Sequence, residues 1–157
     1  MNPPPFSYIT PEQLAALLVA ARPPPGTTTP AHPPALTIVD VRDNDYSGGH
    51  IVGSENIPSY KFSGAAVEAL ARRAVAAAGE GEGEKAKVVF HCMLSQVRGP
   101  KAAGQLARVL DEIDPKREKV EVLVLQGGWQ MFVARMHEDR TLFEDLNPQM
   151  WLGVEQD

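Results

Sequence analysis

Cys92 and Arg98 are the two residues whose chemistry and spacing most directly indicate a reaction centre. Cys92 is the only cysteine of the chain, and five residues separate it from Arg98. A cysteine thiolate is a nucleophile, and the planar guanidinium of arginine can bind two oxygens of a phosphate-like anion. No Asp or Glu lies between the two residues, so we expect an electropositive loop. We predict that Cys92 and Arg98 are catalytic residues.

The segments on either side of this loop predict a strand before it and a helix after it. Val88–Phe90 is a short apolar run typical of a buried strand, and helical spacing begins at Lys101, with Pro100 in the first turn. Free N–H groups at a strand-to-helix turn converge on a point that favours a bound anion and a thiolate. We therefore predict that the whole loop binds substrate, through Met93, Leu94, Ser95, Gln96, Val97 and Arg98.

The alternative for Cys92 is a small apolar residue of the core, a common role for a lone cysteine after a buried strand. The surrounding pattern is more specific than that role requires. It combines a buried strand, His91-Cys92, five further residues and then Arg98-Gly99-Pro100 at a helix start. Ser95 adds a hydroxyl that can donate to the thiolate or to a bound oxygen. We therefore favour the nucleophile.

A resemblance to a known family follows from this loop. The run His-Cys-x-x-Ser-x-x-Arg-Gly-Pro over 91–100 resembles the signature of the M-phase-inducer (cell-division-cycle) phosphatases, which have the rhodanese fold. The small eukaryotic arsenate reductases share that loop and that fold. Two further blocks are similar to rhodanese signatures, one over 40–58 and one, Leu-Gln-Gly-Gly-Trp, over 125–129. The resemblance extends over residues 8–136.

The resemblance implies a phosphatase in which Cys92 attacks phosphorus and forms a phosphocysteine that water hydrolyses. M-phase inducers carry acidic residues at the positions of Met93 and Val97, and a protective cysteine at that of Val41. Because an acid is missing, we expect aryl phosphates or phosphotyrosine-type phosphoproteins as substrates. The missing second thiol suits the alternative, an arsenate reductase with glutathione and glutaredoxin as co-substrate.

Two other functions of the fold are weaker alternatives. Thiosulfate sulfurtransferases of the rhodanese type use a loop one residue shorter than this one. A catalytically inactive rhodanese-like binding module would have no need of an intact Cys92 and Arg98. We expect no cofactor, and a phosphoprotein or a small oxyanion as the bound partner.

Strands that alternate with helices predict an α/β, rhodanese-like fold, with a central parallel sheet flanked by helices on both faces. Thr10-Pro11-Glu12-Gln13 forms a capping box at the first helix. We predict one domain over 1–157 with its core at about 6–140, a proline-rich surface insertion at 23–35 and a C-terminal tail at 141–157 on the surface. The expected strands are 6–9, 36–42, 88–90 and 120–125, and the expected helices are 11–21, 64–78, 101–113 and one containing 131–133.

Four residues are predicted to support the loop rather than to react. They are Asp40, Arg42, His50 and His91. Asp40 and Arg42 are expected to pair and to fix the turn after their strand, and His50 to pack against that turn. The four histidines of the chain have no spacing typical of zinc ligands, and there is no second cysteine, so we predict no metal.

Composition limits the class of protein and its partners. A chain of 157 residues with 43% hydrophobic content is long enough for one ordinary core. A formal net charge of −5 argues against nucleic acid or an anionic membrane as the main partner. One cysteine excludes an internal disulfide, and no apolar run has the length of a membrane span or signal core. We expect a reducing compartment, the cytoplasm and/or the nucleus, and leave the oligomeric state open.

Overall fold

The computed structural model describes residues 5–22, 26, 35–78 and 85–153. The predicted insertion at 23–35 lies outside the described residues, except for Gly26 and Ala35. In chain order the elements are β1 (Ser7–Ile9), α1 (Pro11–Ala20), β2 (Leu36–Asp40), β3 (His50–Ile51), β4 (Glu55–Asn56), the 3-10 helix η1 (Ser59–Lys61), α2 (Ala65–Ala78), β5 (Ala86–His91), α3 (Arg98–Ile113), β6 (Val120–Leu125), α4 (Gly128–Met136), the 3-10 helix η2 (Arg140–Leu142), β7 (Phe143–Glu144) and α5 (Pro148–Leu152).

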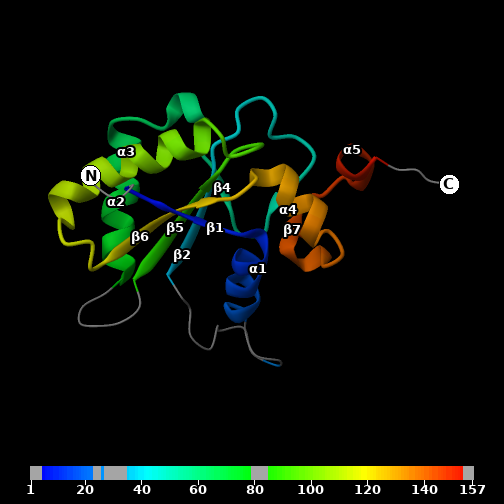
Figure 1. Ribbon diagram of the computed structural model, residues 1–157, viewed down its shortest axis with the longest axis horizontal. Coiled ribbons are helices and arrows are strands. Elements are labelled where there is room, and N and C mark those ends of the chain that lie inside the picture. Colours follow the sequence, from blue (N-terminus) through cyan, green and yellow to red (C-terminus); the bar gives the residue numbers. More distant parts are fainter. Residues whose placement is uncertain (1–4, 23–25, 27–34, 79–84, 154–157) are drawn as a thin grey trace.

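Five parallel strands form the main sheet, in the order β1-β6-β5-β2-β4. Figure 1 shows α1 and α4 on one side of this sheet and α2 and α3 on the other. The predicted fold class is therefore confirmed. Within the described residues, no helix combines the length and the apolar character needed to cross a bilayer.

The central strands are buried on both faces, and their side chains alternate between two cores. In β5, Val88 and Phe90 pack with α2 and α3, whereas Val89 packs with α1 and α4. The alternation arises because successive side chains of a strand point to opposite faces. Strands covered on both sides show the near-continuous apolar runs that made β5 and β6 recognisable in the sequence.

The N-terminus of α1 forms as its sequence predicts. The Thr10 hydroxyl oxygen accepts from the Gln13 N–H at 3.1 Å, and the Gln13 side chain accepts from the Thr10 N–H at 3.0 Å. The capping box is therefore confirmed.

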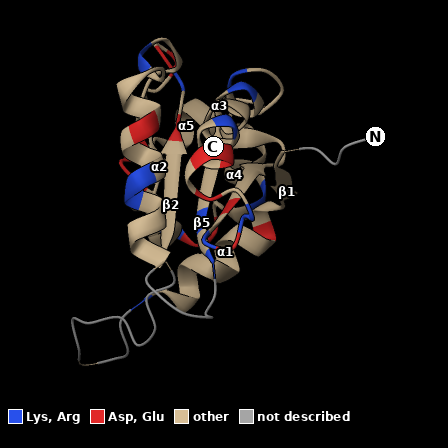
Figure 2. Ribbon diagram, turned by 90° about the vertical axis from the view of Figure 1, so that its left-hand side faces the viewer, with Lys and Arg blue, Asp and Glu red and all other residues tan. Residues whose placement is uncertain are grey.

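On the face seen in Figure 2, basic and acidic residues are interspersed, as in the exposed pair of Glu68 and Arg72 on α2.

The C-terminal segment contributes to the core. Leu142 and Phe143 are buried with α1 and α4, and β7 pairs antiparallel with β3. On α5, Trp151 packs edge-on against Trp129 with ring centroids 5.6 Å apart. The structure therefore places core residues inside the segment 141–157, for which we expected a surface tail. Strands of two residues, such as β3 and β7, are too short to show a hydrophobic period in the sequence.

Candidate active site

The loop after β5 begins at the carboxyl end of a central strand, where sites form in parallel sheets. It ends at Arg98, the first residue of α3, so Arg98-Gly99-Pro100 opens the helix as predicted, and the helix is three residues longer than the expected range 101–113. The first turn of a helix needs no N–H partners, so Gly99 and Pro100 are tolerated inside it. Arg98 therefore projects from the first turn of α3.

The Cys92 sulfur lies at the bottom of this loop. It accepts from the Ser95 N–H at 3.2 Å and from the Gly99 N–H at 3.4 Å, and the residue is 3% exposed. Ser95 has a left-handed backbone, with φ of 57°, and its hydroxyl oxygen accepts from the Cys92 N–H at 3.4 Å. A left-handed serine stores backbone strain, which is held by the surrounding structure at functional sites. Two peptide N–H groups thus donate to the Cys92 sulfur.

Most other N–H groups of the loop have no protein partner. Within the described residues, no acceptor takes the N–H of Met93, Leu94, Gln96, Val97 or Arg98. Successive unpartnered N–H groups at a helix N-terminus form an anion-binding concavity. The predicted substrate-binding residues therefore carry free donors in the described loop, and their role stays a prediction.

Arg98 does not stand alone in this loop. Its Nη1 and Nη2 donate to the two carboxylate oxygens of Asp45 at 2.9 and 2.7 Å, and Nη1 also lies 3.4 Å from Asp43 Oδ2. The hydrogen bond from Arg98 lowers the pKa of Asp45 to about 2, and the same bond raises the pKa of Arg98. Our expectation of an electropositive loop was wrong, because both carboxylates come from a different part of the chain.

The two carboxylates lie in the loop that follows β2, the strand beside β5. These two carboxylates were not predicted, because the spacing of Cys92 and Arg98 carries no information on acids elsewhere in the chain. A usable signal was present: acidic residues directly after a buried parallel strand lie at the same edge of the sheet as a nucleophile after its neighbour.

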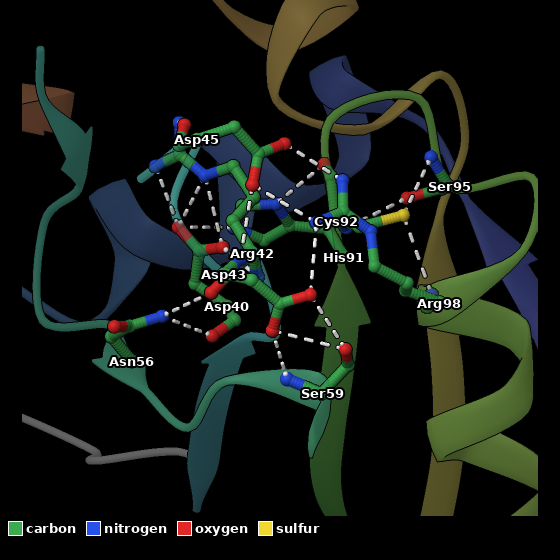
Figure 3. A network of polar contacts seen from close by, with 11 residues as sticks. Asp40, Arg42, Asp43, Asp45, Asn56, Ser59, His91, Cys92, Ser95 and Arg98 are labelled. Atoms are coloured by element: carbon green, nitrogen blue, oxygen red, sulfur yellow. Dashed lines mark hydrogen bonds and ion pairs between the residues drawn. The ribbon is translucent and has the colours of Figure 1, made fainter. Parts of the chain in front are cut away.

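Asp40 and Arg42 form the expected pair at the base of this second loop. Arg42 Nη2 lies 2.7 Å from Asp40 Oδ2 and 2.9 Å from the Gly49 carbonyl oxygen, and both side chains are fully buried. The guanidinium lies over the rings of Tyr46 and Trp129, 5.1 and 4.6 Å from the centroids. Figure 3 shows this pair next to the Arg98 and Asp45 contact.

The two predicted supporting histidines have different surroundings. His91 is fully buried, with Nδ1 3.1 Å from the Cys92 carbonyl oxygen, and burial lowers its pKa. His50 stacks on Tyr46, and its Nε2 lies 3.0 Å from Glu144.

In the described ranges, no three His, Cys, Asp or Glu side chains are grouped as metal ligands would be.

The N-terminus of α4 fixes the other side of the catalytic loop. The Trp129 N–H donates to the Cys92 carbonyl oxygen at 2.9 Å, and the Gln130 N–H donates to that of Met93 at 3.0 Å. Gly128 has φ of 62°, and a Cβ there would lie 2.6 Å from both carbonyl oxygens. The Gly-Gly-Trp block therefore allows close approach of two backbones, a contact that the sequence alone did not reveal.

A pocket of about 310 Å³ lies beside the loop, between η1 and the start of α3. Its lining includes Tyr60, Val97, Arg98 and Lys101. Tyr60 and Val97 are both more than two-thirds exposed, at 72% and 71%. The surface next to the anion-binding loop is therefore partly apolar and open.

The parallel sheet, its two helical layers and the Cys-x5-Arg loop after β5 define a rhodanese-like protein. A family model described as "Rhodanese-like domain" matches residues 28–135. The chain belongs to this family, in the branch related to CDC25-like phosphatases and eukaryotic arsenate reductases.

Three comparisons define this branch. The chain is 34% identical over 134 residues to the CDC25-like phosphatase YCH1 of Saccharomyces cerevisiae, which covers 80% of this chain and 84% of that protein. It is 36% identical over 102 residues to Arsenate reductase 2.1 of Oryza sativa subsp. japonica, which covers 62% of this chain and 58% of that protein. The solved structure of Ygr203w, described as a yeast protein tyrosine phosphatase of the rhodanese family, superposes with a TM-score of 0.75 at 30% identity. That match covers 96% of this chain and 99% of that one.

Proposed function

We propose that the chain is a cysteine-dependent phosphatase that hydrolyses aryl phosphate esters, including phosphotyrosine-type phosphoproteins. The single observation that carries this proposal is the Cys92 sulfur, which accepts from the N–H groups of Ser95 and Gly99 in a loop whose other N–H groups find no acceptor among the described residues. A reducing compartment, cytoplasm and/or nucleus, is part of the proposal because the nucleophile must stay a thiolate.

The reaction has two steps. The Cys92 thiolate attacks phosphorus, so that an S–P bond forms while the bond to the aryl oxygen breaks. The loop N–H groups and Arg98 stabilise the charge that spreads over the three equatorial oxygens. Water then attacks phosphorus, the S–P bond breaks, and phosphate and the thiolate are released.

The aryl preference is supported by the chemistry of three residues at the loop, Met93, Val97 and Asp45. Met93 and Val97 cannot donate a proton to the leaving group. The hydrogen bond from Arg98 lowers the pKa of Asp45 to about 2, so this carboxylate is ionised at neutral pH and cannot serve either. An aryl oxygen leaves without protonation more readily than an alkoxide. The exposed ring of Tyr60 beside the loop offers an apolar contact for such a group.

Arsenate reduction is the second candidate, supported by the single thiol of the chain. Val41, where the M-phase inducers carry a protective cysteine, is a fully buried valine here, so no internal thiol can resolve an adduct at Cys92. Cys92 would form an S–As bond to arsenate while one As–O bond breaks and that oxygen leaves as water, and glutathione would attack the Cys92 sulfur. Arsenite would then leave with two electrons, while Cys92 and glutathione form a mixed disulfide that glutaredoxin reduces.

The test measures p-nitrophenyl phosphate hydrolysis beside glutathione- and glutaredoxin-dependent arsenate reduction. We expect hydrolysis by the wild type, none by Cys92→Ser, which should bind substrate without turnover, and a strong loss in Arg98→Ala. Arsenate turnover without phosphate hydrolysis would establish the second candidate instead. If freshly reduced protein has neither activity, a sulfurtransferase or an inactive binding module is left.

A variant at Tyr60 separates the two candidates further. If the Tyr60 ring contacts an aryl leaving group, Tyr60→Ala should raise KM for p-nitrophenyl phosphate about threefold to tenfold through lost apolar contact. The same variant should leave KM for arsenate unchanged, because arsenate has no aryl group. An equal change for both substrates would contradict this role of Tyr60.

A further inference from the structure

The Arg98 guanidinium is bound at one end only. A guanidinium has five N–H donors in a planar fork. Asp45 takes one N–H from Nη1 and one from Nη2, and Asp43 lies near the second N–H of Nη1. Within the described part of the chain, no acceptor takes the Nε–H. The edge made by Nε–H and the remaining Nη2 N–H is therefore available for two oxygens of an anion.

This open edge faces the reaction centre. Figure 3 shows the Arg98 guanidinium between the Asp45 carboxylate and the Cys92 sulfur. Arg98 is also next in the chain to Gly99, whose N–H donates to the Cys92 sulfur at 3.4 Å. An anion seated on the loop amides above the sulfur would meet the Nε edge.

The loop that carries Asp45 is itself fixed. The Asp43 N–H donates to Asp45 Oδ1 at 3.0 Å, and Asp43 in turn accepts from the N–H and the hydroxyl of Ser59. Further along the loop, the Gly49 carbonyl oxygen accepts from the buried Arg42 guanidinium, and the Gly48 carbonyl oxygen accepts from Trp151. A carboxylate held in this way can set the orientation of its partner.

We propose that Asp45 is a positioning residue, whose two-oxygen contact with Arg98 turns the Nε edge of the guanidinium toward the anion bound over Cys92. This inference rests on the proposed oxyanion chemistry of the loop. It assigns Asp45 a role through Arg98 and no proton transfer of its own.

A double-mutant cycle on the reduced protein tests the proposal. We expect Asp45→Asn to lower kcat for p-nitrophenyl phosphate about tenfold to a hundredfold with a smaller change in KM, because a misplaced catalytic group costs rate. Asp45→Glu should recover part of the loss. In the Arg98→Ala background, Asp45→Asn should change the residual rate less than about threefold, since no guanidinium is left to position.

The matched control is Asp111→Asn. Asp111 also pairs with an arginine, Arg117, at 2.6 Å and far along α3 from the loop, so its loss should leave kcat unchanged. An equal loss of rate from Asp45→Asn in both backgrounds would show a general structural role and overturn the proposal. An increase in kcat/KM would show that Asp45 competes with the anion, which would also overturn it.

Titration with inorganic phosphate separates this inference from the proposed function. If the wild type turns over neither ester nor arsenate but binds phosphate, the catalytic proposal fails while the cycle can still be run on the dissociation constant. If Asp45→Asn weakens phosphate binding in the wild-type background but has no effect in the Arg98→Ala background, the result would support the positioning of Arg98 by Asp45. A wild type that binds no phosphate would overturn both.

Discussion

Asp40 and Arg42 show at the scale of single residues how much the site depends on one buried charge pair. Both side chains are fully buried, and the carboxylate takes contacts from Nε and Nη2 of the guanidinium. Removal of one partner of such a pair leaves an uncompensated buried charge, which costs far more than the pair contributes as a whole. The turn that carries Asp43 and Asp45 begins directly after this pair.

We expect Asp40→Asn to lower the free energy of unfolding by about 3–5 kcal/mol, because Arg42 stays buried without a negative partner. Urea denaturation followed by circular dichroism measures this change. Glu68→Gln breaks the exposed pair with Arg72 and serves as the control, with an expected change of about 0–1 kcal/mol. Equal changes in the two variants would contradict the importance of the buried pair.

The lowered pKa of Asp45 leads us to expect a specific dependence of the folding stability on pH. The Arg98 hydrogen bond lowers its pKa from 3.8 to about 2 in the folded protein. Because the pKa of Asp45 is lower in the folded protein, the pair stabilises the fold fully at pH values above the unfolded pKa of 3.8. This contribution is lost as the pH falls through the folded pKa of about 2. The difference in unfolding free energy between wild type and Asp45→Asn should therefore be constant from neutral pH to about 5, and shrink between about pH 4 and 2.

Denaturant titrations of both proteins at a series of pH values give this difference. Because Asp45 is partly exposed, solvent screening makes the difference in unfolding free energy small. The informative quantity is therefore the pH at which this difference begins to fall. A difference that already falls between pH 7 and 5 would mean that another group holds Arg98.

At the scale of elements, the start of α4 determines the shape of the catalytic loop. The N–H groups of Trp129 and Gln130 bind the carbonyl oxygens of Cys92 and Met93, and Gly128 leaves room for the approach. Two carbonyl oxygens of the loop are thereby bound by α4. A glycine is required here by both the left-handed backbone and the close contact.

We expect Gly128→Ala to lower kcat by at least about tenfold, because its Cβ would collide with two carbonyl oxygens and shift the loop that carries Cys92. Gly153→Ala is the matched control: it has the same φ of 62° but nothing within 4 Å of an added Cβ. The control should lose only about 1–2 kcal/mol from its backbone conformation, with unchanged kcat. Steady-state kinetics and thermal melts of both variants test this expectation. A similar kcat in the two variants would contradict the role of Gly128 in shaping the loop.

The elements that the sequence predicted are those with a long or marked pattern. β6 and its apolar run were predicted with the observed bounds, and α1 was recognised by its capping box. Arg98-Gly99-Pro100 was recognised as the opening of α3, although the expected range began only at 101, because Gly99 and Pro100 are poor helix formers whose cost disappears in a first turn. The short strands β3, β4 and β7 carry too few residues for any period to show.

At the scale of the whole molecule, strand order decides which residues meet. β2 and β5 are neighbours in the sheet, so the loops after them lie side by side and Asp45 reaches Arg98. Hydrophobic periodicity identifies strands but does not specify their order in a sheet. The residues of the loop itself could therefore be predicted from the sequence. The acidic residues after β2 are visible there too, but their pairing with Arg98 follows only once the strand order is known.

The C-terminal segment connects this arrangement to the rest of the fold. Trp151 Nε1 donates to the Gly48 carbonyl oxygen at 2.7 Å, and the Asn147 N–H donates to the same oxygen at 3.0 Å. The Trp151 ring packs on Trp129, which itself lies over Arg42. A segment more than a hundred residues away in the sequence thus helps to fix the loop of Asp45.

We expect Trp151→Ala to increase amide hydrogen exchange in residues 43–50, because both the hydrogen bond to Gly48 and the contact with Trp129 are lost. The same variant should lower kcat through Arg98, since the loop of Asp45 becomes more mobile. Trp151→Phe keeps an aromatic ring but loses the donor, so its exchange should lie between those of wild type and Trp151→Ala. Gln149→Ala, an exposed change on the same helix, is the control. Unchanged exchange in 43–50 in Trp151→Ala would mean that Arg42 alone fixes this loop and that α5 contributes only to the core.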